Sequence, residues 1–234
     1  MMWTLTPVRV GECDVRDYIT FAGGDQSVRR FVLYVWILRG PGGPIIVDTG
    51  PSDPEGFSRS TAEYIPGGVR QAPGERTPVA LRAHGIEPAE VPSVIITHLH
   101  PDHYDFLPIF ETARVFISGQ GFEEGRPALP PEVAAYLEES GRLRLVGDEE
   151  VVPGVSILHL GVHSPCSQAV VVDTDAGRAA LMGDVAYLYD NLREDRPIGG
   201  VDAAVWHRAI ARARSAADHL VPGHDPLVLH EFGG

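Results

Sequence analysis

Short apolar runs separated by glycine- and proline-rich turns recur along the chain, and this pattern predicts many short strands. The clearest run, residues 31–38 (FVLYVWIL), is aromatic and aliphatic throughout and predicts a strand. A Gly-Pro-Gly-Gly turn follows at residues 40–43, and residues 44–48 return as the second arm of a hairpin. The other predicted strands are residues 4–10, 94–96, 114–118, 143–146, 155–158, 169–173, 178–182 and 219–221.

Helical signals lie between these runs. The predicted helices are residues 77–84, 131–140 and 201–217. Thr77 as N-cap, Pro78 at the first helical position and Gly85 after the last turn delimit the first of them. Residues 51–76 are rich in Pro, Gly, Ser and charge and predict no regular element; a loop of this length is often functional.

The order of these elements predicts the fold class. Strands alternate with helices yet also form hairpins, which indicates mixed sheets with helices packed outside them. An apolar fraction of 44% is enough for a substantial core. No Ser/Gly linker or shift in composition divides the chain, so we expect one domain over residues 1–234.

The highest density of potential metal ligands follows the short Val-Ile-Ile run at residues 94–96. Four potential metal ligands come within six residues there: His98, His100, Asp102 and His103. Alternate residues of an extended segment share a side, so His98 and His100 can face one ion, while Pro101 turns the next two towards a neighbouring point. A polar loop with chance histidines is the alternative, and the density argues against it. Imidazole and carboxylate suit zinc, iron, manganese or cobalt better than calcium.

Three more candidates stand where a predicted strand gives way to a glycine turn: His163, Asp184 and His224. Strands of adjoining sheets bring their ends to a common edge, so we expect these residues to join the first four. The seven residues divide into two sets, with Asp184 as a bridge. His98, His100 and His163 would hold one ion, and Asp102, His103 and His224 would hold the other.

Asp48 ends the second arm of the hairpin in an Asp-Thr-Gly sequence. Such a residue is often an ordinary turn former whose side chain bonds the local backbone. Beside a metal motif it can instead orient a ligating histidine. The sequence leaves both readings open.

Charge and composition narrow the function. Lys and Arg total 19 against 32 Asp and Glu, a net charge of −13 with no long basic cluster, which argues against nucleic-acid binding. A negative protein repels anionic substrates at long range, so a neutral small molecule is favoured. The chain has no apolar run long enough to cross a membrane and no secretory signal, and its two cysteines suggest no disulfide framework. A cytoplasmic location is the expectation.

These motifs, in this order, resemble the metallo-β-lactamase superfamily. The matching features are the Thr-His-Leu-His-Pro-Asp-His run at residues 97–103, Asp48 after its strand, Gly-Val-His at 161–163, Gly-Asp at 183–184 and Pro-Gly-His at 222–224. The resemblance implies an α/β (α+β) fold, a four-layer αβ/βα sandwich of two mixed β-sheets with helices outside. It also implies two divalent metal ions at one edge, zinc first, with iron, manganese and cobalt as alternatives, and Asp48 beside them.

Within the superfamily the chain is most similar to the N-acyl homoserine lactonases. The hairpin at residues 36–50, the closing motif at 221–228 and Gly-Glu-Cys at 11–13 carry this similarity. It implies that Tyr187, three residues past Asp184, contacts the substrate carbonyl, although a tyrosine there can equally be packing. The chain departs from the family at residues 104–107 and 164–168, two loops expected to border the pocket. Phe106, Leu107 and Phe110 would then line an acyl pocket or pack beneath the metal loop.

The expected reaction is hydrolysis of a lactone, such as an N-acyl homoserine lactone, or of a related ester. A hydroxide shared by two metal ions would attack the carbonyl, Tyr187 would stabilise the oxyanion, and Asp102 would carry a proton to the departing alkoxide. The alternatives are a mononuclear-iron sulfur dioxygenase and a hydrolase of glutathione thioesters, both of the same superfamily. A small-molecule substrate is expected, without nucleic acid or membrane, and a homodimer is compatible with the sequence.

Overall fold

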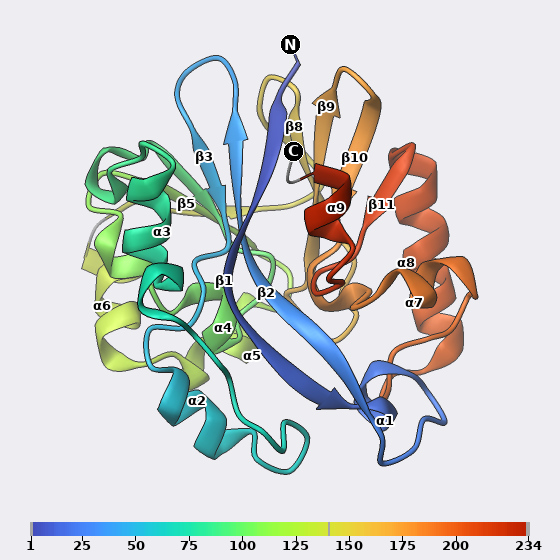
Figure 1. Ribbon diagram of the computed structural model, residues 1–234. Coiled ribbons are helices and arrows are strands. Elements are labelled where there is room, and N and C mark those ends of the chain that lie inside the picture. The colour runs from blue at the N-terminus through green and yellow to red at the C-terminus, as the bar shows by residue number, and fades with distance from the viewer. Residues whose placement is uncertain (1, 140, 233–234) are drawn as a thin grey trace.

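The computed structural model describes residues 2–139 and 141–232, which form two β-sheets lying face to face (Figure 1). The first sheet contains, in spatial order, β1 (Thr4–Arg16), β2 (Val28–Arg39), β3 (Ile45–Val47), β4 (Ser93–Ile95), β5 (Arg114–Ser118) and β6 (Leu143–Val146). The second contains β11 (His219–Val221), β10 (Gly177–Leu181), β9 (Gln168–Thr174), β8 (Val155–His159) and β7 (Glu150–Val152). Both sheets are mixed: β3 to β6 are parallel in the first, and β10 and β11 are parallel in the second.

Helices cover the outer faces, as the sequence predicts. In Figure 1, α3 (Thr77–Ala83) and α6 (Pro131–Glu139) flank the first sheet, while α7 (Tyr189–Arg193) and α8 (Ala203–Ala216) flank the second. The shorter helices are α1 (Asp17–Thr20), α2 (Pro54–Ser60), α4 (Pro101–Tyr104), α5 (Phe122–Gly125) and α9 (Val228–Phe232). Single 3₁₀ turns occur at η1 (Pro73–Glu75), η2 (Pro88–Glu90), η3 (Leu107–Ile109), η4 (Arg126–Ala128) and η5 (Gly183–Val185). The predicted four-layer sandwich is confirmed, and no helix among the described residues is long and apolar enough to span a membrane.

Strand β2 shows why its sequence is apolar without alternation. Its side chains point to opposite faces in turn. Tyr34 and Trp36 pack between the two sheets. Val35 and Ile37 pack on the other face with Leu81 of α3. Both faces of the strand are therefore buried, which requires a continuous run of apolar residues.

Two local predictions are wrong. Strand β1 continues to Arg16 rather than ending at Val10, because its register shifts between Arg9 and Gly11 and the pairing with β2 resumes. The N-cap of α3 is Arg76, and Thr77 is its first helical residue. The Thr77 hydroxyl donates to the Thr49 carbonyl at 2.6 Å, so it fixes the Asp-Thr-Gly turn instead of capping the helix.

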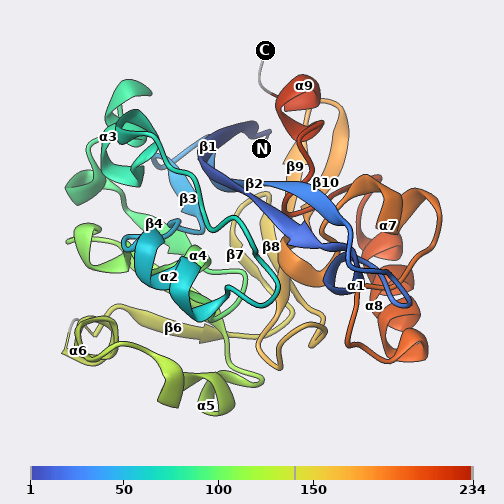
Figure 2. The same cartoon turned by 60° about the horizontal axis from the view of Figure 1, so that its bottom comes forward.

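Residues 51–76 are more regular than their composition indicates. Helix α2 begins after Asp53, whose carboxylate accepts the Gly56 N–H at 2.9 Å, and η1 lies later in the same segment. Helix α2 lies beside α4 in both views (Figures 1 and 2). The last residue of the predicted helix 131–140 lies outside the described residues.

Candidate metal centre

Five strand ends meet at one edge of the sandwich. Strands β3 and β4 are parallel and finish together. Strands β8, β10 and β11 run in one direction, because β9 is antiparallel to both β8 and β10 and β11 is parallel to β10. The structure brings together all seven predicted ligands after these strands, together with Asp48. The residues are His98, His100, Asp102, His103, His163, Asp184 and His224.

The first cluster contains three imidazoles. His100 Nδ1 lies 3.0 Å from His98 Nε2 and 2.9 Å from His163 Nε2. Asp184 Oδ2 lies 3.3 Å from His163 Nε2 and 3.7 Å from His98 Nε2. Ligand atoms arranged tetrahedrally around one zinc ion, with bonds of 2.0–2.1 Å, lie roughly 3.3 Å apart. The four atoms therefore have the spacing of ligands converging on one ion.

The second cluster contains Asp102, His103 and His224. Asp184 Oδ1 lies 2.8 Å from His224 Nε2 and 3.3 Å from His103 Nε2, and Asp102 Oδ2 lies 3.5 Å from His103 Nε2. The two oxygens of Asp184 thus face different clusters, which is the arrangement of a bridging carboxylate.

Outer hydrogen bonds fix which nitrogen of each imidazole faces inward. His103 Nδ1 donates to Asp48 Oδ2 at 2.8 Å, and His224 Nδ1 donates to the Val32 carbonyl at 3.0 Å. In the neutral form of each imidazole, Nε2 then presents a lone pair to the cluster. Among the described residues, His103 Nε2 is buried and accepts no hydrogen bond. A buried unpaired acceptor costs about 1–3 kcal/mol, and a cation at this point would satisfy it. The donor set fits a metal ion.

Asp48 is built into this support. Its Oδ1 accepts the Thr97 N–H at 2.7 Å, and its Oδ2 accepts the Thr97 hydroxyl at 2.8 Å in addition to His103. Thr97 Oγ1 lies 3.2 Å from His98 Nδ1, so it can accept that N–H in turn. The backbone of Asp48 is left-handed, with φ of 60°, a conformation that Asp and Asn tolerate better than most residues. The geometry favours the orienting role over that of an ordinary turn residue.

Burial and charge set the protonation states of the clusters. Burial lowers the pKa of His163 to about 4 and that of His98 well below its usual range, so both are neutral at pH 7. Burial alone would raise the pKa of the Asp184 carboxyl, yet the neighbouring imidazoles of His224 and His103 hold it well below its usual value. In the second cluster the surrounding carboxylates outweigh burial and raise the pKa values of His103 and His224, so a metal ion binding there would displace a proton from each imidazole.

The sequence shows the family of the chain. A model of the metallo-beta-lactamase superfamily matches residues 28–224. The chain belongs to the metallo-beta-lactamase superfamily.

Relatives in this superfamily include lactonases. The chain is 27% identical over 204 residues to an N-acyl homoserine lactonase of Bacillus sp., covering 82% of this chain and 81% of that one. A solved N-acyl homoserine lactone hydrolase, with its product N-hexanoyl-L-homoserine at the catalytic metal centre, superposes with a TM-score of 0.81 at 23% identity, covering 99% and 97% of the two chains. A Bacillus thuringiensis relative, solved with N-decanoyl-L-homoserine at its active site, also has a TM-score of 0.81 at 23% identity, with the same coverage. The chain is thus a metallo-β-lactamase-fold hydrolase of lactonase-like sequence.

A cavity of about 360 Å³ opens over the candidate metal centre. Its metal end is lined by His100, Asp102, His163, Asp184, Tyr187 and His224. Its wall is largely apolar and includes Val15, Ile19, Phe31, Phe57, Tyr64 and Ile65. A volume of this size suits a small-molecule ligand with one polar end.

Tyr187 lines the metal end of the cavity. Its hydroxyl lies 3.0 Å from His163 Nδ1. Because His163 Nε2 faces the first cluster, the proton is on Nδ1. The Nδ1–H donates a hydrogen bond to the phenol oxygen of Tyr187, and the phenol O–H remains free to donate to a ligand. Burial, with the Asp184 charge, raises the pKa of Tyr187 well above its usual value, so the phenol stays protonated.

The two loops expected to border the cavity do not line it. Tyr104 and Leu107 are buried in the core beneath the first sheet, and so is Phe110; packing is therefore their role. Asp105 Oδ2 accepts the Ser52 N–H at 2.9 Å and the Ser52 hydroxyl at 2.6 Å. This loop anchors the start of α2. The loop 164–168 is likewise absent from the lining.

Sequence reasoning missed the wall residues Phe57, Tyr64 and Ile65. They come from the segment that predicted no regular element, where aromatic residues in a polar loop were the available signal. Cys13 also lines the cavity, and burial raises the pKa of its thiol to about 12, so the thiol is a poor nucleophile at neutral pH.

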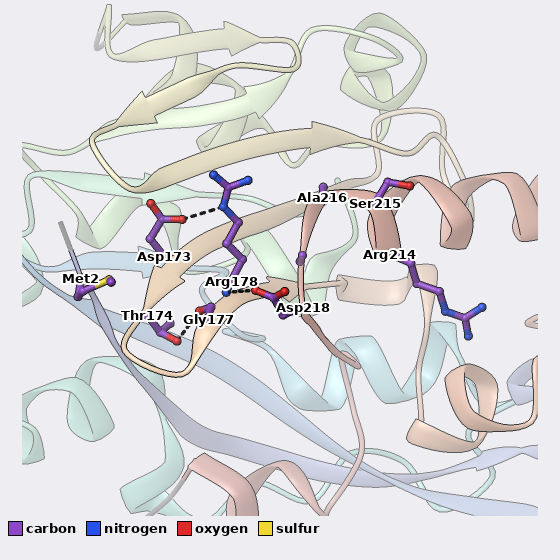
Figure 3. A pocket seen from close by; sticks show the side chains of 10 residues that line it. Met2, Asp173, Thr174, Gly177, Arg178, Arg214, Ser215, Ala216 and Asp218 are labelled. Carbon is purple, nitrogen blue, oxygen red and sulfur yellow. Dashed lines mark hydrogen bonds and ion pairs between the residues drawn. The ribbon is translucent and has the colours of Figure 1, made fainter.

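A second pocket, of about 520 Å³, lies at the far end of β10, beside the β9–β10 turn (Figure 3). Its charged groups are paired within the protein: Arg178 Nε contacts Asp173 Oδ1 at 3.1 Å, and the Arg178 N–H donates to Asp218 Oδ2 at 2.8 Å. Arg214 donates to the Leu192 carbonyl at 2.8 Å. Members of both ligand clusters found among the described residues line the other cavity.

Proposed function

We propose that this protein opens the ring of a lactone of the N-acyl homoserine lactone class at a centre of two divalent metal ions. The observation that carries the proposal is the position of Asp184, whose two oxygens face two separate ligand clusters at the base of one cavity. Asp184 would bridge the ions, which zinc suits well because the donors are imidazole and carboxylate. The first ion would be held by the imidazoles of the first cluster, and the second ion by Asp102, His103 and His224.

Two such ions lower the pKa of a bound water and polarise a carbonyl oxygen. The remaining steps depend on side chains of this chain. Tyr187 would donate its O–H to the carbonyl oxygen as negative charge develops there. Asp102 would carry the proton of the attacking water to the departing ring oxygen as the lactone C–O bond breaks. The product is a hydroxy acid.

The shape and charge of the cavity support this class of substrate. Its apolar wall matches an acyl chain, and its polar base matches a lactone ring. The net charge of −13 favours a neutral substrate over an anionic one. Relatives named as N-acyl homoserine lactonases point the same way.

Two other activities, that of a mononuclear-iron sulfur dioxygenase and that of a glutathione-thioester hydrolase, fit the site less well. A mononuclear-iron dioxygenase needs one cluster of ligands, whereas the second cluster here has a buried His103 Nε2 without a hydrogen-bond donor. A glutathione thioester is anionic, and no Arg or Lys is found among the residues that line the cavity.

The test is turnover of a panel of lactones, aryl esters, thioesters and phosphodiesters by metal-replete protein. N-acyl homoserine lactones should be cleaved fastest, with two metal ions bound per chain. Rapid cleavage of another class without lactone hydrolysis would refute the substrate. One iron per chain with oxygen uptake would refute the hydrolase.

A further inference from the structure

Tyr64 lines the cavity, and nothing in the described part of the chain hydrogen-bonds its hydroxyl. The other hydroxyls of this wall are used internally. Ser60 Oγ donates to the Phe57 carbonyl at 2.9 Å, and Thr61 Oγ1 donates to the same carbonyl at 2.7 Å. The Tyr64 hydroxyl is therefore free to donate a hydrogen bond to a ligand, whereas the Ser60 and Thr61 hydroxyls already donate within the protein.

The backbone around Tyr64 is held in place. Its N–H donates to the Thr61 carbonyl at 3.0 Å, and its carbonyl accepts the Arg16 N–H of β1 at 2.8 Å. The next residue, Ile65, also donates to the Thr61 carbonyl, at 2.8 Å. The tyrosine is thus fixed to the first sheet before any ligand arrives, and little ordering is needed on binding.

Tyr64 lines the same cavity as the metal centre. The lining of this cavity also includes Asp102 and Tyr187 at its metal end. Burial raises the pKa of the Tyr64 phenol, and the Asp102 charge adds to the effect, so the hydroxyl is a donor at neutral pH. The Tyr64 phenol in turn raises the pKa of Tyr187, so the two phenols are close enough to interact electrostatically.

We propose that the Tyr64 hydroxyl donates a hydrogen bond to the amide carbonyl of an N-acyl homoserine lactone. The proposal rests on the proposed function. In such a substrate the amide separates the lactone ring from the acyl chain. With the ring at Tyr187 and the chain along Phe57 and Ile65, the amide passes the position that Tyr64 occupies. Tyr64 is thus a specificity-determining residue that distinguishes N-acyl lactones from simple alkyl lactones.

The experiment compares Tyr64→Phe with the wild type on two substrates: N-hexanoyl-L-homoserine lactone and an alkyl γ-lactone of matched length that lacks the amide. The variant keeps the ring and loses only the hydroxyl. Loss of one neutral hydrogen bond should lower kcat/KM for the N-acyl lactone about 3- to 10-fold, mainly through KM. The value for the alkyl lactone should not change. Tyr136→Phe, which removes a phenol hydroxyl on α6 bound to the Phe110 carbonyl, is the control and should change neither substrate.

An equal fall for both lactones would show that Tyr64 acts through the structure of the wall and would overturn the proposal. So would unchanged kinetics for the N-acyl lactone. Wild-type protein that hydrolyses neither lactone would instead refute the proposed function itself, and the two failures are thereby distinguished.

Discussion

Asp48→Asn tests whether a carboxylate outside the ligand set controls one of the two ion sites. Asp48 accepts His103 Nδ1–H at 2.8 Å and two hydrogen bonds from Thr97, at 2.7 and 2.8 Å. In the variant one oxygen becomes an NH₂ group. If the NH₂ group faces His103, it meets the Nδ1–H, and two donors oppose each other. If it faces Thr97, it meets the backbone N–H of that residue with the same result. Either way His103 loses the anion that orients and polarises it. Asn tolerates the left-handed backbone of residue 48, so backbone strain is not the cause of the effect.

The magnitude follows from the place of Asp48 in the structure. Removing the hydrogen-bond partner behind a ligating histidine costs about 10–100-fold in metal affinity, or about 1.4–2.8 kcal/mol. His103 belongs to the second cluster, whereas His98, His100 and His163 belong to the first. We therefore expect the ion of the second cluster to bind 10–100-fold more weakly, and the affinity of the first cluster, which Asp48 reaches only through Thr97, to fall much less.

The assay is titration of metal-free protein with Zn²⁺ against a competing chromophoric chelator. Asp17→Asn is the matched control, because it neutralises a buried carboxylate that binds Arg29 rather than a histidine, and it should leave both affinities unchanged. Equal weakening of both sites, or no weakening at all, would refute the assignment of Asp48 to the second cluster.

Two further predictions concern groups that line the cavity. Tyr187→Phe should lower kcat about 100-fold, because the donor to the oxyanion is lost. The variant also removes the acceptor of the His163 Nδ1–H, so steady-state kinetics is measured at saturating Zn²⁺ with metal analysis alongside. Unchanged kcat would show that Tyr187 is packing. Burial raises the pKa of the Cys13 thiol to about 12, so almost no thiolate is present at pH 8. Iodoacetamide, followed by mass spectrometry, should therefore label Cys13 far more slowly in the native protein than in urea. Equal labelling rates would contradict this.

Most of the metal centre could be predicted from sequence because its residues are tied to recognisable local patterns. Four ligands follow one buried strand within six residues, and the other three each follow a strand at a glycine turn. Parallel strands bring such ends to one edge, so the assembly of distant residues required only the strand directions. The sandwich followed from the mixture of hairpins and helices in the same way.

The wall of the cavity could not be predicted, for a physical reason. Helix α2 is short and depends on the Asp53 cap and on hydrogen bonds to Asp105, contacts that local propensity does not contain. The position of Tyr64 depends on pairing with Arg16 in a strand that extends past its expected end through a register shift at Gly11. Thr77 shows the same limit, since its hydroxyl serves a residue 28 positions away rather than its own helix.

The central claim is that Asp184 bridges two ions that together open a lactone. Metal content and N-acyl homoserine lactone turnover of Asp184→Asn, measured beside the wild type, test it most directly. The account predicts two ions per chain in the wild type, and fewer than two in the variant with turnover abolished, because an amide supplies one neutral oxygen where two charged ones are needed. Two ions and full turnover in Asp184→Asn would contradict it.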